Sequence, residues 1–97
     1  LFLEEVKNFI RGLPKDVQGK IFASVTILES GGFESVYVKT LRRQIKELIT
    51  KDYRFVFFIS RGTIYFVGAF VKKTAKTPKQ EIEKAEKIYK LVTNNDK

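Results

Sequence analysis

Apolar residues in the first third of the chain recur at steps of three and four, which is the spacing of one face of an α-helix. A first run extends from Phe2 to Leu13, and a second begins after Pro14, a residue that the first turn of a helix tolerates. The two apolar stripes are Leu3, Val6, Phe9, Ile10 and Leu13 in the first run, and Val17, Ile21, Phe22, Val25 and Leu28 in the second. Gly31-Gly32 follows, and glycine readily takes the positive φ that ends a helix. Residues 1–31 therefore predict a helical hairpin.

From Phe33 onward the pattern changes to short segments rich in β-branched and aromatic residues, which favour strands. "QIKELI", "YRFVFFIS" and "TIYFVGAFV" predict three strands, and "FESVYVKTL" before them fits either a strand or an extended connection. Arg61-Gly62 stands between the last two strands and predicts a two-residue hairpin turn. Residues 33–73 thus predict an antiparallel sheet of three or four strands.

The last apolar stripe predicts a C-terminal helix over residues 77–92. Thr77 is expected as its N-cap, Pro78 as its first residue and Gln80 as the partner in a capping box. The stripe consists of Ile82, Ala85, Ile88, Tyr89 and Val92, and residues 93–97 are expected to form a frayed tail. The whole chain, residues 1–97, is therefore predicted to be one α+β domain: an N-terminal helical hairpin, an antiparallel sheet and a C-terminal helix.

The composition indicates a packed core that needs neither a disulfide nor a metal. Of the 97 residues 43% are hydrophobic, and the absence of cysteine excludes disulfides and thiolate zinc sites. No run of apolar residues is long enough for a membrane span, and Glu4 and Glu5 stand where a signal peptide is basic, so neither is expected. We expect a cytoplasmic location, because a chain without disulfides suits a reducing compartment. Methionine is absent even at position 1, so we also expect native residues before Leu1.

The net charge of +8 favours a polyanion or an acidic protein as the partner. Positive residues gather in "FVKKTAKTPK", where the last predicted strand gives way to the last helix. A helix N-terminus already attracts anions, so further cations beside it are favourable only when a negative ligand is present. This placement predicts a phosphate site.

Arg54 stands inside an otherwise apolar strand, and the hairpin register predicts what lies beside it. With Arg61-Gly62 as the turn, Arg54 lies opposite Ala69, and alternation along the strand puts Lys73 on the same side of the sheet. Lys72 then points to the other side, unless the strand ends or bulges before it.

This register leaves two interpretations of Arg54. In the first, Arg54, Lys73 and Lys76 form an anion site at the strand ends. In the second, Arg54 lies at an exposed edge or pairs with Glu47 or Asp52, because an unpaired charge is rarely buried.

A second basic group lies before and within the first predicted strand. Such a run is usually a solvated surface, and the alternative is that it follows a phosphate backbone. Its members are Lys39, Arg42, Arg43 and Lys46. Three nearby tyrosines, Tyr37, Tyr53 and Tyr65, either pack in the core or stack on bases.

The residue types exclude most catalytic chemistry. Histidine and cysteine are absent, no phosphate-binding glycine loop is present, and the carboxylates are scattered without a metal cluster. The remaining candidates, lysine, arginine, tyrosine and isolated glutamate, suit RNA cleavage in which the 2′-OH of the RNA is the nucleophile. The protein then aligns this hydroxyl and stabilises the charged phosphorane. A crowded lysine or Glu47 is the candidate base, and no metal or cofactor is expected.

The segment "YVKTLRRQIKELITKDYRFVFFISRGTIYFVGAFVKKTAKTPKQEIEKAEKIY" resembles the RelE/HigB toxins of type II toxin–antitoxin systems, and most of all their phage-derived branch. The motif "FVKKTAKTPKQEI" carries the resemblance, together with Tyr53-Arg54 and the N-terminal "LPKDVQGKIFASVTILESGG". The similarity covers residues 10–92. One position departs from the family: Ile49 follows Glu47-Leu48 where the family has arginine.

The resemblance implies a RelE-like fold and an mRNA interferase, often acting on the ribosome and neutralised by a helix-turn-helix antitoxin. It implies catalytic roles for Arg54, Lys72, Lys73 and Lys76, and a substrate contact for Lys39. Relatives on this fold, the ParE toxins, poison DNA gyrase instead. The alternative is therefore a non-enzymatic toxin, or a relative that binds only an antitoxin or nucleic acid.

Overall fold

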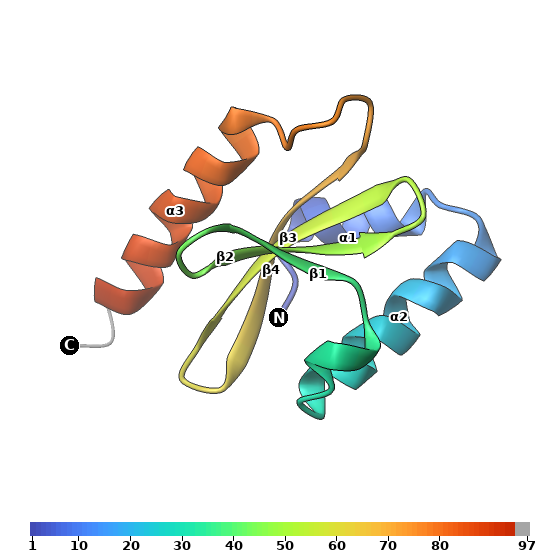
Figure 1. The fold of residues 1–97 in the computed structure, drawn as a ribbon, viewed down its shortest axis with the longest axis horizontal. Helices are drawn as coiled ribbons and strands as arrows, with labels where there is room; N and C mark the ends of the chain where they lie inside the picture. The colour runs from blue at the N-terminus through green and yellow to red at the C-terminus, as the bar shows by residue number, and fades with distance from the viewer. Residues whose placement is uncertain (95–97) are drawn as a thin grey trace.

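Three helices and a four-stranded antiparallel sheet form residues 1–94, the part of the chain that the computed structural model describes (Figure 1). In chain order the elements are α1 (Glu4–Arg11), α2 (Lys15–Glu29), a 3-10 turn η1 (Phe33–Ser35), β1 (Val38–Arg42), β2 (Ile45–Thr50), β3 (Tyr53–Ser60), β4 (Thr63–Val71) and α3 (Lys79–Asn94). The strands lie in the order β1-β2-β3-β4, so each pairs with its neighbours in sequence. The predicted α+β class is confirmed, and the sheet has four strands.

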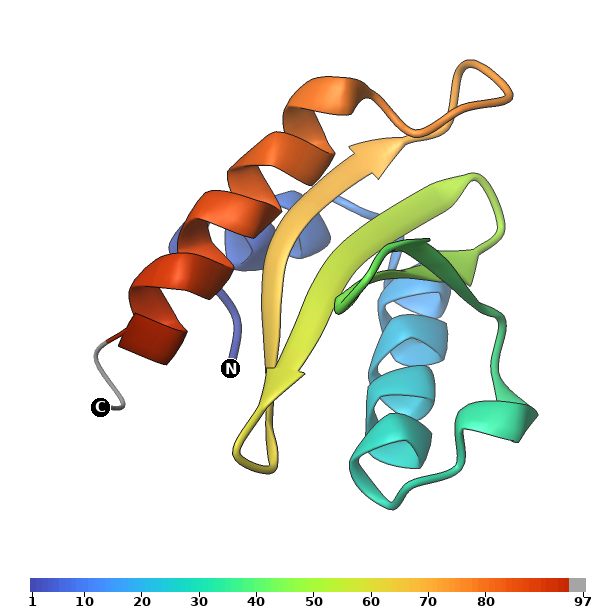
Figure 2. The ribbon, with the colours of Figure 1, turned by 60° about the vertical axis from the view of Figure 1, so that its left-hand side comes forward.

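The sheet separates two hydrophobic clusters, each covered by helices. On one face α1 and α2 pack over a cluster in which Ile21 and Phe55 are almost completely buried. On the other face α3 packs over Val56 and Phe58, and the ring of its Tyr89 meets Phe58 edge-on at 5.1 Å. Figure 2 shows α2 and α3 on opposite sides of the sheet. No helix within residues 1–94 is both long and apolar enough to cross a membrane.

The N-terminal helices follow the predicted stripes with one exception. Val17, Ile21, Val25 and Leu28 of α2 are buried as expected, whereas the side chain of Phe22 is 49% exposed. Phe22 lies about 100° around the helix from Ile21, which turns it out of the line of contact with the sheet. The prediction of Phe22 as a core residue was therefore wrong.

The segment "FESVYVKTL" divides into the turn η1 and the strand β1, which answers the question that its pattern left open. Ser60 pairs with Thr63 as predicted, and Arg61 and Gly62 have φ values of 49° and 78°. Two successive residues with positive φ are typical of the tight turn that matches the twist of a hairpin.

A β-bulge in β4 changes the predicted register. Phe58 pairs with Tyr65 as predicted, but Val56 pairs with Gly68 and Arg54 pairs with Phe70 instead of Ala69. One extra residue in a strand moves every later side chain to the opposite face. The prediction that Lys73 shares the face of Arg54 was therefore wrong, and Lys72 takes that place.

The C-terminal helix begins at Lys79, one residue after Pro78, and continues to Asn94. The hydroxyl of Thr77 donates a hydrogen bond to Glu47 on β2 at 2.6 Å. The predicted N-cap residue thus binds a different element of the fold. Of the predicted tail, residues 93–94 belong to the helix, and residues 95–97 lie outside the described part of the chain.

Candidate functional site

A small cleft lies on the α3 side of the sheet, beside the loop that leads from β4 into α3. Strands β1 to β4 contribute its floor, and the loop forms one wall. The cleft is lined by Lys39, Glu47, Ile49, Arg54, Phe70, Lys72, Thr74, Ala75, Lys76 and Thr77.

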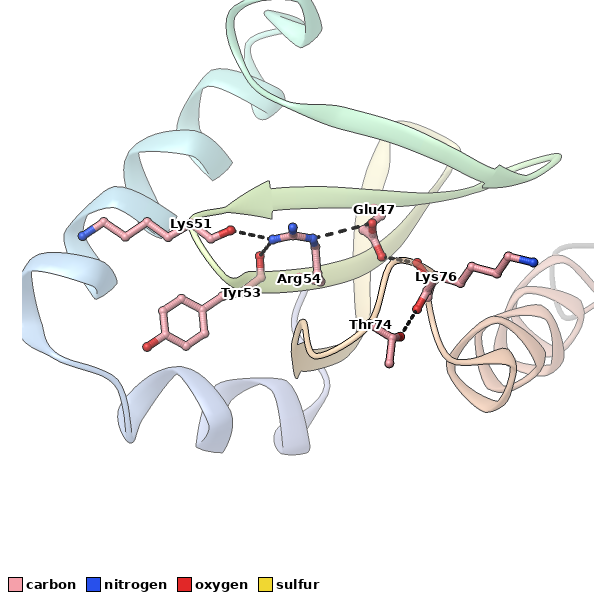
Figure 3. Close-up of polar contacts among 7 residues, drawn as sticks. Glu47, Lys51, Tyr53, Arg54, Thr74 and Lys76 are labelled. Carbon is pink, nitrogen blue, oxygen red and sulfur yellow. Dashed lines mark hydrogen bonds and ion pairs between the residues drawn. The ribbon is translucent and has the colours of Figure 1, made fainter.

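Arg54 lies in the floor of the cleft and is held by three contacts (Figure 3). Its Nη1 donates to the carbonyl oxygens of Lys51 at 2.6 Å and Tyr53 at 3.1 Å. Its Nε lies 3.9 Å from Oε1 of Glu47. The residue is only 8% exposed, so the structure realises the ion pair with Glu47 rather than an exposed edge. These contacts fix the orientation of the guanidinium at the floor of the cleft.

Glu47 is 3% exposed and has a partner for each of its carboxylate oxygens. Oε1 faces Arg54, and Oε2 accepts the hydrogen bond from Thr77. A buried carboxylate is stable only when it is paired and hydrogen-bonded, and here both conditions are met. The contacts connect β2, β3 and the loop before α3 in the floor of the cleft.

Three exposed lysines stand around this floor: Lys39, Lys72 and Lys76. None of them forms an ion pair with another residue of the described chain. The side chain of Lys76 extends away from Arg54, while its carbonyl oxygen accepts a hydrogen bond from Thr74 at 2.9 Å (Figure 3). Of the predicted catalytic residues, the cleft therefore contains Arg54, Lys72 and Lys76.

Lys73, the fourth predicted catalytic residue, lines an adjoining hollow with Val71 and Pro78. The bulge in β4 is the cause, because it reverses the alternation that the simple hairpin register implied.

The second basic group disperses over the molecule. Arg42 pairs with Glu86 of α3 at 2.7 Å, and Arg43 occupies the turn between β1 and β2 with a φ of 50°. Lys46 alternates with Glu47 along β2, so it projects from the opposite face, where it donates to Thr40 at 3.2 Å. Lys39 is the member of this group that lies in the cleft.

Sequence reasoning missed Thr77 as a site residue and assigned its hydroxyl to the helix. The one signal in the sequence was that charged residues stand inside predicted strands, Lys46 and Glu47 in "QIKELI" and Arg54 in "YRFVFF". Such residues require partners when they are buried. The pattern does not indicate that the hydroxyl of Thr77 is the partner of Glu47, because Thr77 lies 30 positions further along the chain.

The arrangement suits a phosphate group. An oriented guanidinium presents paired donors to phosphate oxygens, and lysines add point charges from the rim. Within residues 1–94 no cluster of three or more acidic side chains is positioned to hold a metal ion.

The fold is RelE-like, as a comparison with solved structures shows. Its structure is similar to a chain in the crystal structure of the RelB–RelE antitoxin–toxin complex from Methanococcus jannaschii, with a TM-score of 0.61 and 14% sequence identity. The match covers 73% of this chain and 88% of the other. No curated protein sequence is significantly similar to the chain.

The family is shown by the sequence itself. Residues 8–90 match the family described as "Phage derived protein Gp49-like". The chain belongs to this phage-derived family, which is of the RelE/HigB type, and the resemblance on the motif "FVKKTAKTPKQEI" is thereby confirmed.

Proposed function

We propose that the protein is the toxin of a type II toxin–antitoxin pair and that it cleaves RNA in the cleft around Arg54. The observation that carries this proposal is the cleft itself: protein contacts fix the guanidinium of Arg54, and three exposed lysines line the same cleft. A cleft of this charge attracts phosphate, and the family has RelE-type toxins as its relatives.

The 2′-OH of the substrate is the nucleophile in the proposed reaction. Its oxygen attacks the adjacent phosphorus and loses its proton to a base, and the 5′-oxygen leaves and takes up a proton. The products are a 2′,3′-cyclic phosphate and a 5′-OH end, and no metal takes part. Arg54 and Lys72 stabilise the negative charge that grows on the phosphorane, while Lys39 and Lys76 hold the flanking phosphates.

Glu47 acts in this scheme as a positioning residue. Both of its carboxylate oxygens already have partners, and the group is shielded from solvent. In this scheme one of the rim lysines therefore accepts the proton in place of Glu47, and it holds a phosphate once it is protonated.

The partner of the proposed toxin is an antitoxin. The similar structure from Methanococcus jannaschii is a complex of an antitoxin with a toxin, which supports a partner of this kind. We further infer that the antitoxin carries a helix-turn-helix domain, that the RNA is mRNA engaged on the ribosome, and that the pair acts in the cytoplasm.

The test compares two adjacent lysines that the bulge in β4 separates. Wild type, Lys72→Ala and Lys73→Ala are expressed in a bacterium under an inducible promoter, and mRNA 5′ ends are mapped by primer extension. We expect new cuts and growth arrest with wild type and Lys73→Ala, and a loss of cutting of about 100-fold or more with Lys72→Ala. Equal activity in the two variants would contradict the proposal that RNA is cleaved in this cleft.

A non-enzymatic binder is the second candidate, and a specific observation favours it. The charge of Arg54 is balanced by Glu47, and Ile49 lines the cleft where the family has arginine. Growth arrest with intact mRNA and altered DNA supercoiling would favour a gyrase poison. In vitro, a synthetic RNA that binds but is not cut would favour a nucleic-acid-binding relative.

A further inference from the structure

One row of side chains crosses the sheet through the cleft and continues to its β1 edge. Arg54 pairs with Phe70 on one side and with Ile49 on the other. The backbone N–H of Ile49 donates to the carbonyl oxygen of Tyr37 at 2.9 Å, so Tyr37 is the next member of the row. Because Lys39 follows Tyr37 by two residues, alternation along the chain places both on the face of the cleft.

Tyr37 differs from the other tyrosines on the sheet in its exposure. Tyr65 stacks on Phe58 at 5.1 Å, and Tyr53 packs against the first helical layer, with its ring 6.2 Å from that of Phe9. Tyr37 is 79% exposed. An exposed aromatic ring beside a phosphate-binding cleft has the chemistry of a platform for a nucleic-acid base.

Further positive side chains lie around the β1 edge of the sheet, towards α2. A shallow hollow between Tyr37 and α2 is lined by Lys20 of α2, by Ile49 and by Lys51 of the β2–β3 turn. The amine of Lys51 lies 3.9 Å from Oδ2 of Asp16. Ile49 lines both the hollow and the cleft, so the two adjoin. A strand of RNA can thus lie with one phosphate in the cleft and one base near Tyr37, where the cleft borders the hollow.

We propose that Tyr37 forms a nucleotide subsite in which it stacks on the base next to the phosphate held at Arg54. Tyr37 and Arg54 are two strand spacings apart, about 10 Å, which is comparable with the reach from a phosphate to the base of a neighbouring nucleotide. Ile49 lies between them as an apolar surface for the sugar and the base edge. This inference rests on the proposed function, and it assigns RNA rather than protein to this edge of the sheet.

The test uses a fluorescein-labelled RNA decamer of mixed sequence in which every 2′-OH is methylated, so that binding is measured without cleavage. Fluorescence anisotropy at fixed salt gives the dissociation constant for wild type, Tyr37→Ala and Tyr37→Phe. We expect Tyr37→Ala to weaken binding roughly 5- to 150-fold, the range that base–aromatic stacking energies correspond to. Tyr37→Phe keeps the ring and should bind within about twofold of wild type.

A fluorescence experiment tests the stacking directly. The chain contains no tryptophan, so Tyr37→Trp introduces a single one, and Phe22→Trp on the exposed side of α2 is the matched control. Addition of the same decamer, unlabelled, should quench the tryptophan at position 37 and leave the one at position 22 unchanged.

The outcomes separate this inference from the proposed function. Unchanged affinity in Tyr37→Ala, or loss of antitoxin binding alone, would overturn the subsite and leave the nuclease proposal in place. Binding with quenching by a protein that does not cut unmodified RNA would support the subsite and overturn the nuclease. No binding by wild type would overturn both.

Discussion

Glu47 is the residue on which the geometry of the cleft depends. It is buried, and its two partners come from β3 and from the loop before α3. Loss of one partner leaves a buried polar atom without a hydrogen bond, which costs more than the bond itself contributes. The contact with Thr77 therefore stabilises the fold and also holds the carboxylate that orients Arg54.

Thr77→Val removes this contact while the volume of the side chain changes little. Because Oε2 of Glu47 then lacks its donor, we expect the free energy of unfolding to fall by about 1–3 kcal/mol. Urea denaturation followed by circular dichroism measures the change. Thr74→Val is the control, since Thr74 is exposed, and it should stay within about 0.5 kcal/mol of wild type. Equal stability of the two variants would contradict the role of Thr77.

At the scale of elements, turns and bulges decide which face each charged residue occupies. The turn at Arg61-Gly62 sets the first pairs of the hairpin, and the bulge in β4 then shifts the remaining pairs by one residue. The result is that Lys72 enters the cleft and Lys73 leaves it. A change that disturbs the turn acts on the whole hairpin, because β3 and β4 pair along their entire length.

Two glycine-to-alanine substitutions test the conformations of the elements. Gly62 has a φ of 78°, so Gly62→Ala should destabilise the protein by about 1–2 kcal/mol through backbone strain, although the space around it is open. Gly19 lies exposed within α2 and also has open space around it, so Gly19→Ala should stabilise the protein by about 0.5–1 kcal/mol. Thermal unfolding of both variants checks the opposite signs, and a shift in the same direction would contradict one of the two conformations.

At the scale of the whole molecule, a net charge of +8 attracts any polyanion, but only part of that charge faces the cleft. Arg42 is engaged by Glu86, and Lys84 of α3 pairs with Glu5 of α1. Such exposed pairs contribute little to stability, yet they reduce the positive field on their side of the protein. The contacts to RNA phosphates should therefore come from the lysines of the cleft.

The salt dependence of RNA binding measures the number of these contacts. If Lys39, Lys72 and Lys76 each neutralise one phosphate, the logarithm of the binding constant should fall with the logarithm of salt concentration with a slope of about −2. Lys72→Ala should reduce the slope by about 0.7, whereas Lys73→Ala should leave it unchanged. A slope that follows the total charge, with equal effects of both variants, would indicate diffuse attraction without a defined cleft.

Local patterns were sufficient to predict the elements and several of their boundaries. The stripes of α1, α2 and α3 and the pairing of Ser60 with Thr63 depend on side-chain periods and turn residues within a few positions of one another. The family motif identified the fold for the same reason, because it is a continuous stretch of sequence.

The composition of the cleft was decided by tertiary structure. "TIYFVGAFV" is apolar at almost every position because helices cover both faces of the sheet, so its pattern does not reveal the extra residue of the bulge. The partner of Thr77 and the exposure of Tyr37 depend on which distant segments pack beside them. The sequence by itself therefore determined the elements and the excess of positive charge of this protein. Tertiary structure decided that Lys72 and not Lys73 lines the cleft, and that Tyr37 is exposed while Tyr65 packs on Phe58. The reason is that register and burial arise between segments that are far apart in the chain.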